Sequence, residues 1–550
     1  MTDRYRVSRV LVGHFFRRFF DSDTIQADGE TLTTVIRAVA MVAVPGLMVS
    51  FFLQNQYPQR PPWGAIQDQY FFVLFSSLVM GAVTIFEWEM LFPDRLDFLI
   101  LSPLPIKPLQ ILAAKTAALF GFLVLFLFSS NLFAMMILPA VSRGDFFRHV
   151  YAHGIAVLLA GVFASFFFLA FGGVLLCLLG AARFRMVSPI MQMVSVAALV
   201  LLMLQYAMYG NSMQALLSEP LGMTRWVPPL WFLGMYEHLL HGDAAPAFAQ
   251  GMERYAVRGT LAAVGAVFLT YPAAWRRIRK MAVEGSSRGR RQQPRWLACL
   301  VHQVVRRPGK RAVFHFIGQT IARNNRYQVY LAMYCGTGLA LALACAVTFR
   351  TENQSLQPAL SNRGLHAIMP LLLFWVIAGL RTAFAFPLDL SAGWIFRVTG
   401  VRVSDCAAGA RRWVLVCAMS VMCGILAALR VAGWDLRRLL VQVVCGLCLC
   451  VLLTDGFFAS HQAVPFNRPR MPGRTSLPIM LTLYVGVAPL FIFGVVSMEM
   501  QVEKNLLKLL PLGLTAAVIH AALGLLREGS EEIEEEMEGY EGEFQLLGLS

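Results

Sequence analysis

Residues 116 to 138 read TAALFGFLVLFLFSSNLFAMMIL, a run of 23 residues without a charged side chain. A helix needs about 20 consecutive apolar residues to cross the hydrocarbon core of a bilayer. Comparable runs recur along the chain, which is 57% hydrophobic and 14% charged over 550 residues, with a mean hydropathy of +0.60. A water-soluble protein cannot bury this much apolar surface, so the sequence predicts an all-α integral membrane protein.

Twelve apolar segments have about the length of a membrane-spanning helix. They are 34–53, 70–91, 116–138, 153–180, 188–209, 257–275, 329–349, 365–386, 413–430, 439–459, 477–498 and 509–526. Gly172 and Gly173 mark a possible break in the fourth. Residues 4 to 20 place arginines between apolar residues at helical spacing. This pattern is typical of a helix at the membrane interface, and a basic lead-in to the first span explains it equally well.

The basic residues predict which way the chain crosses the membrane. Of the 47 Lys and Arg residues, 32 lie on the same side of the twelve spans as the N-terminus and 12 lie on the other side. Cytoplasmic loops carry the excess of Lys and Arg in membrane proteins. We therefore expect both termini in the cytoplasm. The net charge of +15 then reflects topology, and no nucleic-acid partner is expected.

Short motifs recur between the two halves of the chain. Ser188-Pro189-Ile190-Met191 opens the fifth predicted span, and Leu477-Pro478-Ile479-Met480 opens the eleventh. Phe92-Pro93 and Phe386-Pro387 close the second and eighth spans. Six spans followed by six in the same orientation predict two parallel repeats.

This repeat predicts four parts. They are a first six-span half with its interfacial helix (1–275), a basic cytoplasmic linker (276–328), a second six-span half (329–526) and an acidic cytoplasmic tail (527–550). The end of the linker, from Val313 to Arg323, is a candidate interfacial helix of the second half. The tail carries nine glutamates between residues 528 and 543, so we expect it to be solvated and poorly ordered.

Several kinds of chemistry are missing from the sequence. The only Gly-Lys pair, Gly309-Lys310, lacks the other residues of a P-loop, so no nucleotide site is expected in this chain. A C-x2-C-x-C run begins at Cys445, but apolar neighbours favour buried cysteines over a metal site. Asp455 and the other charges inside spans lie toward the predicted cytoplasmic ends. We therefore predict no catalytic, cofactor-binding or metal-binding residues.

The largest predicted outer loop, residues 210 to 256, contains two prolines followed by aromatic residues. These are Pro228, Pro229, Trp231, Phe232 and Tyr236. Aromatic side chains settle at headgroup depth, so the pattern predicts a short helix re-entering the outer interface. The following Glu237 to His241 has H-x-x-H spacing but no evident third ligand, which favours a solvated polar edge.

A polar loop with a Leu-Pro turn separates the second and third spans, between residues 92 and 115. Its candidate functional residues are Asp94, Arg95, Asp97, Leu104, Pro105, Ile106 and Lys107. An acidic/Arg cluster, then Leu-Pro-Ile, then a Lys starting the third span resembles the ATPase-coupling loop of ABC-2-type exporter permeases. An interfacial helix before the first span and a re-entrant outer segment between spans five and six are also typical of that family.

The resemblance implies a permease subunit in the bacterial cytoplasmic (inner) membrane. ATP and Mg²⁺ would bind in two separate ATPase subunits, while this chain supplies the translocation path through the lipid bilayer. The second half departs from the pattern because its corresponding loop lacks Leu-Pro. Its weaker coupling residues would be Trp394, Arg397 and Arg402. Two alternatives stay open, an ion-coupled secondary carrier and a membrane enzyme acting on lipid-linked substrates, and the exported substrate is not predicted.

Overall fold

The structure is a computed structural model of the chain. It describes residues 2–20, 31–88, 100–101, 103–142, 144–209, 224–284, 307–352, 355–384, 403–458, 466 and 477–544. The chain divides into two compact units. Unit 1 comprises residues 1–188 and 198–289, and unit 2 comprises residues 189–197 and 290–550.

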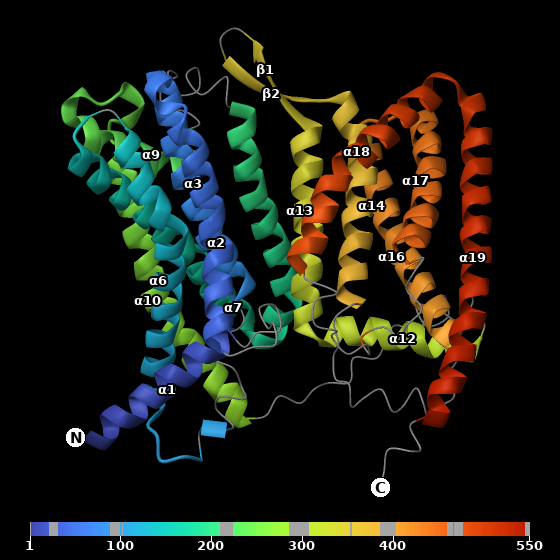
Figure 1. Cartoon of the computed structure of the whole chain (residues 1–550), viewed down its shortest axis with the longest axis horizontal. Coiled ribbons are helices and arrows are strands. Elements are labelled where there is room, and N and C mark those ends of the chain that lie inside the picture. The colour runs from blue at the N-terminus through green and yellow to red at the C-terminus, as the bar shows by residue number, and fades with distance from the viewer. Residues whose placement is uncertain are drawn as a thin grey trace. The chain divides into compact units, whose positions relative to one another are not determined.

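Unit 1 is a bundle of helices (Figure 1). Its elements are α1 (Thr2–Phe20), α2 (Thr31–Gln54), η1 (Tyr57–Gln59), α3 (Pro62–Phe86), α6 (Pro108–Val141), α7 (Phe146–Tyr209, apart from residues 189–197), η2 (Thr224–Trp226), α9 (Pro228–His241), η3 (Gly242–Ala244), η4 (Ala247–Ala249) and α10 (Met252–Glu284). Helix α3 is the most buried candidate span of this unit, since 67% of its apolar 18-residue stretch is buried. Asn131 of α6 donates to the Ser76 hydroxyl, which donates to the Val157 carbonyl, so α3, α6 and α7 are joined inside the bundle.

Unit 2 is also helical, with one β-hairpin. Its elements are α12 (Pro308–Arg323), α13 (Asn325–Ala346), β1 (Val347–Glu352), β2 (Ser355–Leu360), α14 (Asn362–Phe384), α16 (Val403–Val431), α17 (Leu436–Phe457), α18 (Leu477–Lys504), η6 (Leu506–Lys508) and α19 (Leu509–Phe544). Helix α14 packs against α13, α16, α17 and α18, and 78% of its apolar 18-residue stretch is buried. Gly364 and Gly338 allow α13 and α14 to approach closely, since a Cβ on either would collide with the other helix.

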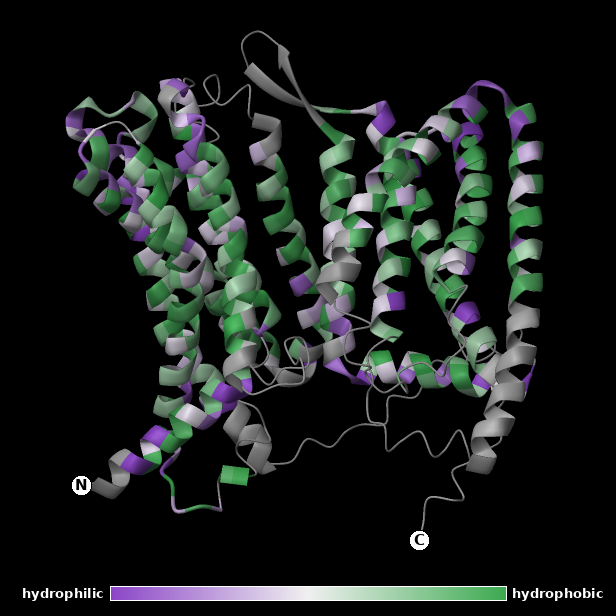
Figure 2. Cartoon of the chain, viewed as in Figure 1, coloured by the Kyte–Doolittle hydropathy of each residue, from purple (hydrophilic) through white to green (hydrophobic). Residues whose placement is uncertain are grey.

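Within the described residues, eleven helices are long and apolar enough to cross a membrane, and they correspond to the second through twelfth predicted spans. The prediction of an all-α membrane protein is confirmed. The first predicted span falls in α2, whose described apolar part, Ala38–Gln54, is shorter, so this first span, and with it the total of twelve, stays a prediction. Polar residues gather toward the helix ends, as a bilayer requires (Figure 2).

Three details differ from the predictions. The fourth span continues through Gly172 and Gly173, and the non-helical residue is Gly180, with φ 74°. The seventh span ends at Ala346 because Val347, Thr348 and Phe349 favour a strand, and β1 pairs antiparallel with β2 from Val347↔Leu360 to Glu352↔Ser355.

The third difference is at the C-terminal end of the chain. Helix α19 continues through the acidic segment to Phe544, where the sequence predicts a poorly ordered tail. Glutamate is a good helix former, so the segment extends the last span without a break.

Candidate functional site

Part of the predicted coupling loop lies within the described residues. The Ile106 amide donates to the Leu104 carbonyl at 2.7 Å, and the Lys107 amide donates to the Gln110 side chain at 3.1 Å. This cap and Pro108 at the first helical position start α6 eight residues before the predicted span. Leu104 is 47% exposed, so the turn presents an apolar side chain on a constrained backbone. Asp94, Arg95 and Asp97 lie outside the described residues.

Helix α1 packs directly against the beginning of α6. The Lys115 ammonium lies 5.6 Å from the centre of the Phe15 ring, and the rings of Phe19 and Phe122 are 5.1 Å apart. Lys115, predicted to close the polar loop, is instead buried within α6. Burial of Leu11, Phe15 and Phe19 at four-residue spacing gives α1 one apolar face against unit 1.

Unit 2 contains a similar arrangement, in which α12 packs against the beginning of α16. The Lys310 ammonium lies 3.4 Å from an Asp405 carboxylate oxygen. Gly409 lets the Lys310 carbonyl approach α16, since a Cβ there would lie 3.0 Å from it. Val313 and Ile317 are buried, which confirms an amphipathic helix where the sequence placed one. The second set of coupling residues, Trp394, Arg397 and Arg402, lies outside the described residues.

The predicted outer segment forms helix α9, which packs against α3 and α10. Pro228 occupies the first helical position and Pro229 the next, where a missing amide hydrogen costs nothing. Phe232 and Tyr236 are fully buried, and the Trp231 indole donates to the Arg225 carbonyl at 2.8 Å. A helix at this place is confirmed, while its depth in a membrane stays a prediction.

Glu237 is not at a solvated edge, as the sequence predicted, but is buried in unit 1. Its carboxylate lies 3.1 Å from the ring of exposed His241 and accepts a hydrogen bond from Gln69 of α3. Burial raises the pKa of Glu237, and His241 and Gln69 offset part of this effect. Because α9 turns this residue toward α3, H-x-x-H spacing alone gave no signal of its burial.

A second buried carboxylate lies nearby at the start of α3. The Arg60 guanidinium donates two hydrogen bonds to the Asp68 carboxylate, of 2.6 and 2.9 Å. Burial and the neighbouring Asp68 charge raise the pKa of Tyr57 well above its ordinary value. This polar cluster holds the loop after α2 onto α3, and sequence reasoning overlooked it because Asp68 precedes the predicted span.

Within the described ranges, no three His, Cys, Asp or Glu side chains are grouped so as to hold a metal ion. The nine cysteines of that part of the chain are free thiols. Comparison with known proteins gave no match to this chain, whether by family models, by curated sequences or by solved structures. The fold defines its class as an all-α, multi-pass membrane protein.

Proposed function

We propose that the chain is the permease subunit of an ATP-driven exporter of the ABC-2 type. It supplies the translocation path, and separate subunits bind ATP and Mg²⁺ and supply the energy. The observation that carries the proposal is the exposed Leu104 turn at the start of α6, next to the docked helix α1.

The geometry of this turn suits the transmission of force. An apolar side chain such as Leu104 fills a groove on a partner, while the adjacent Lys107 and the sequence neighbours Asp94 and Arg95 set orientation. The turn runs without an intervening loop into α6, which begins at Pro108. The contacts of Lys115 and Phe122 with α1 then make α1 and α6 move together.

The arrangement of α12 on α16 supports a second point of force transmission in unit 2. Lys310 and Asp405 tie these helices as Lys115 and Phe15 tie α6 to α1. The two contacts are unequal, because the second half has no Leu-Pro motif in its loop. We expect one ATPase subunit at each half, with the Leu104 turn making the stronger contact.

The direct test is affinity purification of the full chain from native membranes, followed by identification of the proteins bound to it. A stoichiometric P-loop ATPase supports the proposal, as does transport that stops when ATP is depleted. Transport that continues without ATP, in a preparation with no ATPase, would contradict it.

Such a result would favour the second candidate, an ion-coupled carrier. Carboxylates that bind a coupling ion must be shielded from bulk water, and Asp68, Glu237 and Glu499 are all buried. A carrier of this kind loses transport when the ion gradient is collapsed with ionophores and keeps it when ATP is removed.

A further inference from the structure

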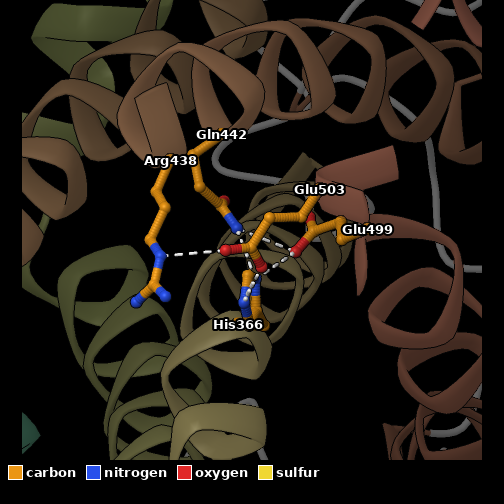
Figure 3. Close-up of polar contacts among 5 residues, drawn as sticks. All are labelled: His366, Arg438, Gln442, Glu499 and Glu503. Atoms are coloured by element: carbon orange, nitrogen blue, oxygen red, sulfur yellow. Dashed lines mark hydrogen bonds and ion pairs between the residues drawn. The ribbon is translucent and has the colours of Figure 1, made fainter. Parts of the chain in front are cut away.

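Three helices of unit 2 bring ionisable and polar side chains together at one end of the bundle (Figure 3). His366 comes from the first turns of α14, Gln442 from α17 and Glu499 from α18, and each is at most 2% exposed. Glu503, one turn after Glu499, and Arg438, one turn before Gln442, complete the group and reach solvent in part. We call these five residues the His366 cluster.

The contacts within the His366 cluster place a donor against one nitrogen of the imidazole. The Gln442 amide nitrogen lies 2.9 Å from Glu499 Oε2 and 3.1 Å from His366 Nδ1. An amide nitrogen only donates, so Nδ1 faces it as an acceptor and the ring hydrogen is on Nε2. Nε2 lies 3.2 Å from Glu503 Oε2 but makes no hydrogen bond in the described part of the chain. Arg438 donates to the other Glu503 oxygen at 2.9 Å. The imidazole is neutral in this arrangement.

With a neutral imidazole the cluster lacks one proton. Two carboxylates face a single cation, Arg438, so the group carries a net charge of −1 at a buried place. Glu499 Oε1 and Gln442 Oε1 have no hydrogen-bond partner in the described part of the chain. His366 Nδ1 also lies 3.5 Å from Glu499 Oε2, so a lone pair faces a carboxylate. An uncompensated buried charge is costly, and one added proton removes it.

Among the described residues, the other cations at this end of the packed helices have exposed side chains. The centre of the Trp434 ring lies 4.8 Å from the centre of the imidazole, and the Arg438 guanidinium lies over the same Trp434 ring, 5.9 Å from its centre. Other titratable or charged groups near this end of the packed helices are Asp435, Arg437 and Cys445 of α17, Lys504 of α18, Cys345 of α13, Arg430 of α16 and Arg363 of α14. Arg430 and Arg363 are exposed at the helix ends, and the thiols carry no positive charge.

We propose that the His366 cluster is a proton-binding site. The proton is added to the lone pair of His366 Nδ1, which then donates to Glu499 while Nε2 donates to Glu503. The Gln442 amide nitrogen then moves away from Nδ1, because two donors would otherwise face each other, and it keeps its hydrogen bond to Glu499. The proton comes from water and returns to water at the edge where Glu503 and Arg438 are partly exposed.

The bound proton has a mechanical consequence. An imidazolium between two carboxylates joins the beginning of α14 to the last turns of α18 more strongly than a neutral ring does. Gln442 ties α17 into the same group. On the predicted topology this end of the helices faces the outside of the cell. Protonation at an acidic exterior therefore strengthens the contacts among the ends of α14, α17 and α18, and deprotonation at an alkaline exterior weakens them. This effect does not depend on the energy source of the protein.

Trp434 provides a built-in reporter, because a protonated imidazole in contact with an indole quenches its fluorescence. The experiment uses the full chain in lipid nanodiscs and takes the emission difference between wild type and W434F across pH 5 to 8, where histidine titrates. We expect Trp434 emission to fall several-fold on acidification along a one-proton curve. A Trp434 emission that stays constant over this pH range overturns the proposal.

Variants assign the titration to its residue. In H366Q the pH dependence of Trp434 emission should disappear, and in E499Q it should change, because the carboxylate that accepts from the added hydrogen is gone. H520Q is the matched control, since His520 pairs with Asp455 of α17 away from the cluster, and its titration curve should equal that of wild type. An unchanged curve in correctly folded H366Q would show that another group titrates and would refute the site.

Discussion

Lys115 of α6 lies over the ring of Phe15 of α1, with its ammonium 5.6 Å from the ring centre, and both side chains are almost completely buried. A cation held against an aromatic face and shielded from water contributes on the order of 2 kcal/mol. This contact attaches the amphipathic helix α1 to the beginning of α6. The helix is therefore held by protein as well as by any membrane surface.

Replacing Phe15 by alanine should release α1 from α6. Truncating a buried Phe costs about 3–5 kcal/mol in a well-packed core, and the Lys115 ammonium would also lose its aromatic partner. We expect trypsin to cleave after Arg17 much faster in F15A than in wild type, measured by mass spectrometry of the purified protein. V10A is the control, because Val10 is 67% exposed on the same helix and should leave cleavage unchanged. Equal cleavage in F15A and wild type would contradict the docked position of α1.

The Leu104 turn offers a test of coupling that spares the fold. L104D puts a charge at the centre of the proposed ATPase contact, where loss of a central apolar residue costs about 2 kcal/mol or more of binding free energy. We expect at least a tenfold loss of ATPase association by co-purification, with normal membrane insertion. L104M keeps an apolar side chain of similar volume and should bind as wild type does. Unchanged association in L104D would remove the turn from the ATPase interface.

The sequence predicted the fold well where a single local pattern determines it. Uninterrupted apolar runs such as 116–138 became helices, and the apolar spacing from Val313 to Ile321 became a docked amphipathic helix. These signals are local because a helix satisfies its own backbone hydrogen bonds in an apolar environment.

The buried polar clusters were not predictable in the same way. Glu499 and Glu503 lie at the end of a predicted span, where acidic residues are ordinarily solvated. Their contact with His366 depends on α14 and α18 packing together, which no single segment encodes. The burial of Glu237 was missed for the same reason, since the packing of α9 on α3 decides which side of α9 is buried. The start of α6 was missed for another reason, because the predicted span began only after Lys115.

Gly172 and Gly173 turned out to be contact points instead of a break, and this predicts a steric effect. A Cβ at Gly172 would lie 2.5 Å from the Trp88 indole nitrogen, and Trp88 is a large side chain that is almost completely buried. G172A should therefore destabilise unit 1 by about 1–3 kcal/mol. The matched control is G265A in α10, where nothing lies within 4 Å and alanine should stabilise the helix slightly. Thermal unfolding of both variants in the same detergent measures the difference, and equal midpoints would contradict the close packing.

Glu237 predicts a pH dependence that can be separated from that of the His366 cluster. Burial raises the pKa of this carboxyl above its ordinary value of 4.5, so the folded chain keeps a proton that the unfolded chain releases. Stability from Glu237 is thus fully present below pH 4.5 and is lost as the pH rises through the folded pKa.

Substituting glutamine should remove this loss, since its amide keeps the shape of the protonated acid and carries no charge to bury. Each unit of pKa difference corresponds to about 1.4 kcal/mol, so E237Q should be more stable than wild type by about 1 kcal/mol at neutral pH. The advantage should vanish near pH 4.5, the ordinary value for this group. The E237Q variant also loses the ion pair with His241. This loss costs little stability, because His241 is exposed and ion pairs that reach solvent are weak. Unfolding midpoints of both proteins across this range give the result, and a stability difference that does not change with pH would show that the pKa of Glu237 is the same in the folded and unfolded chain.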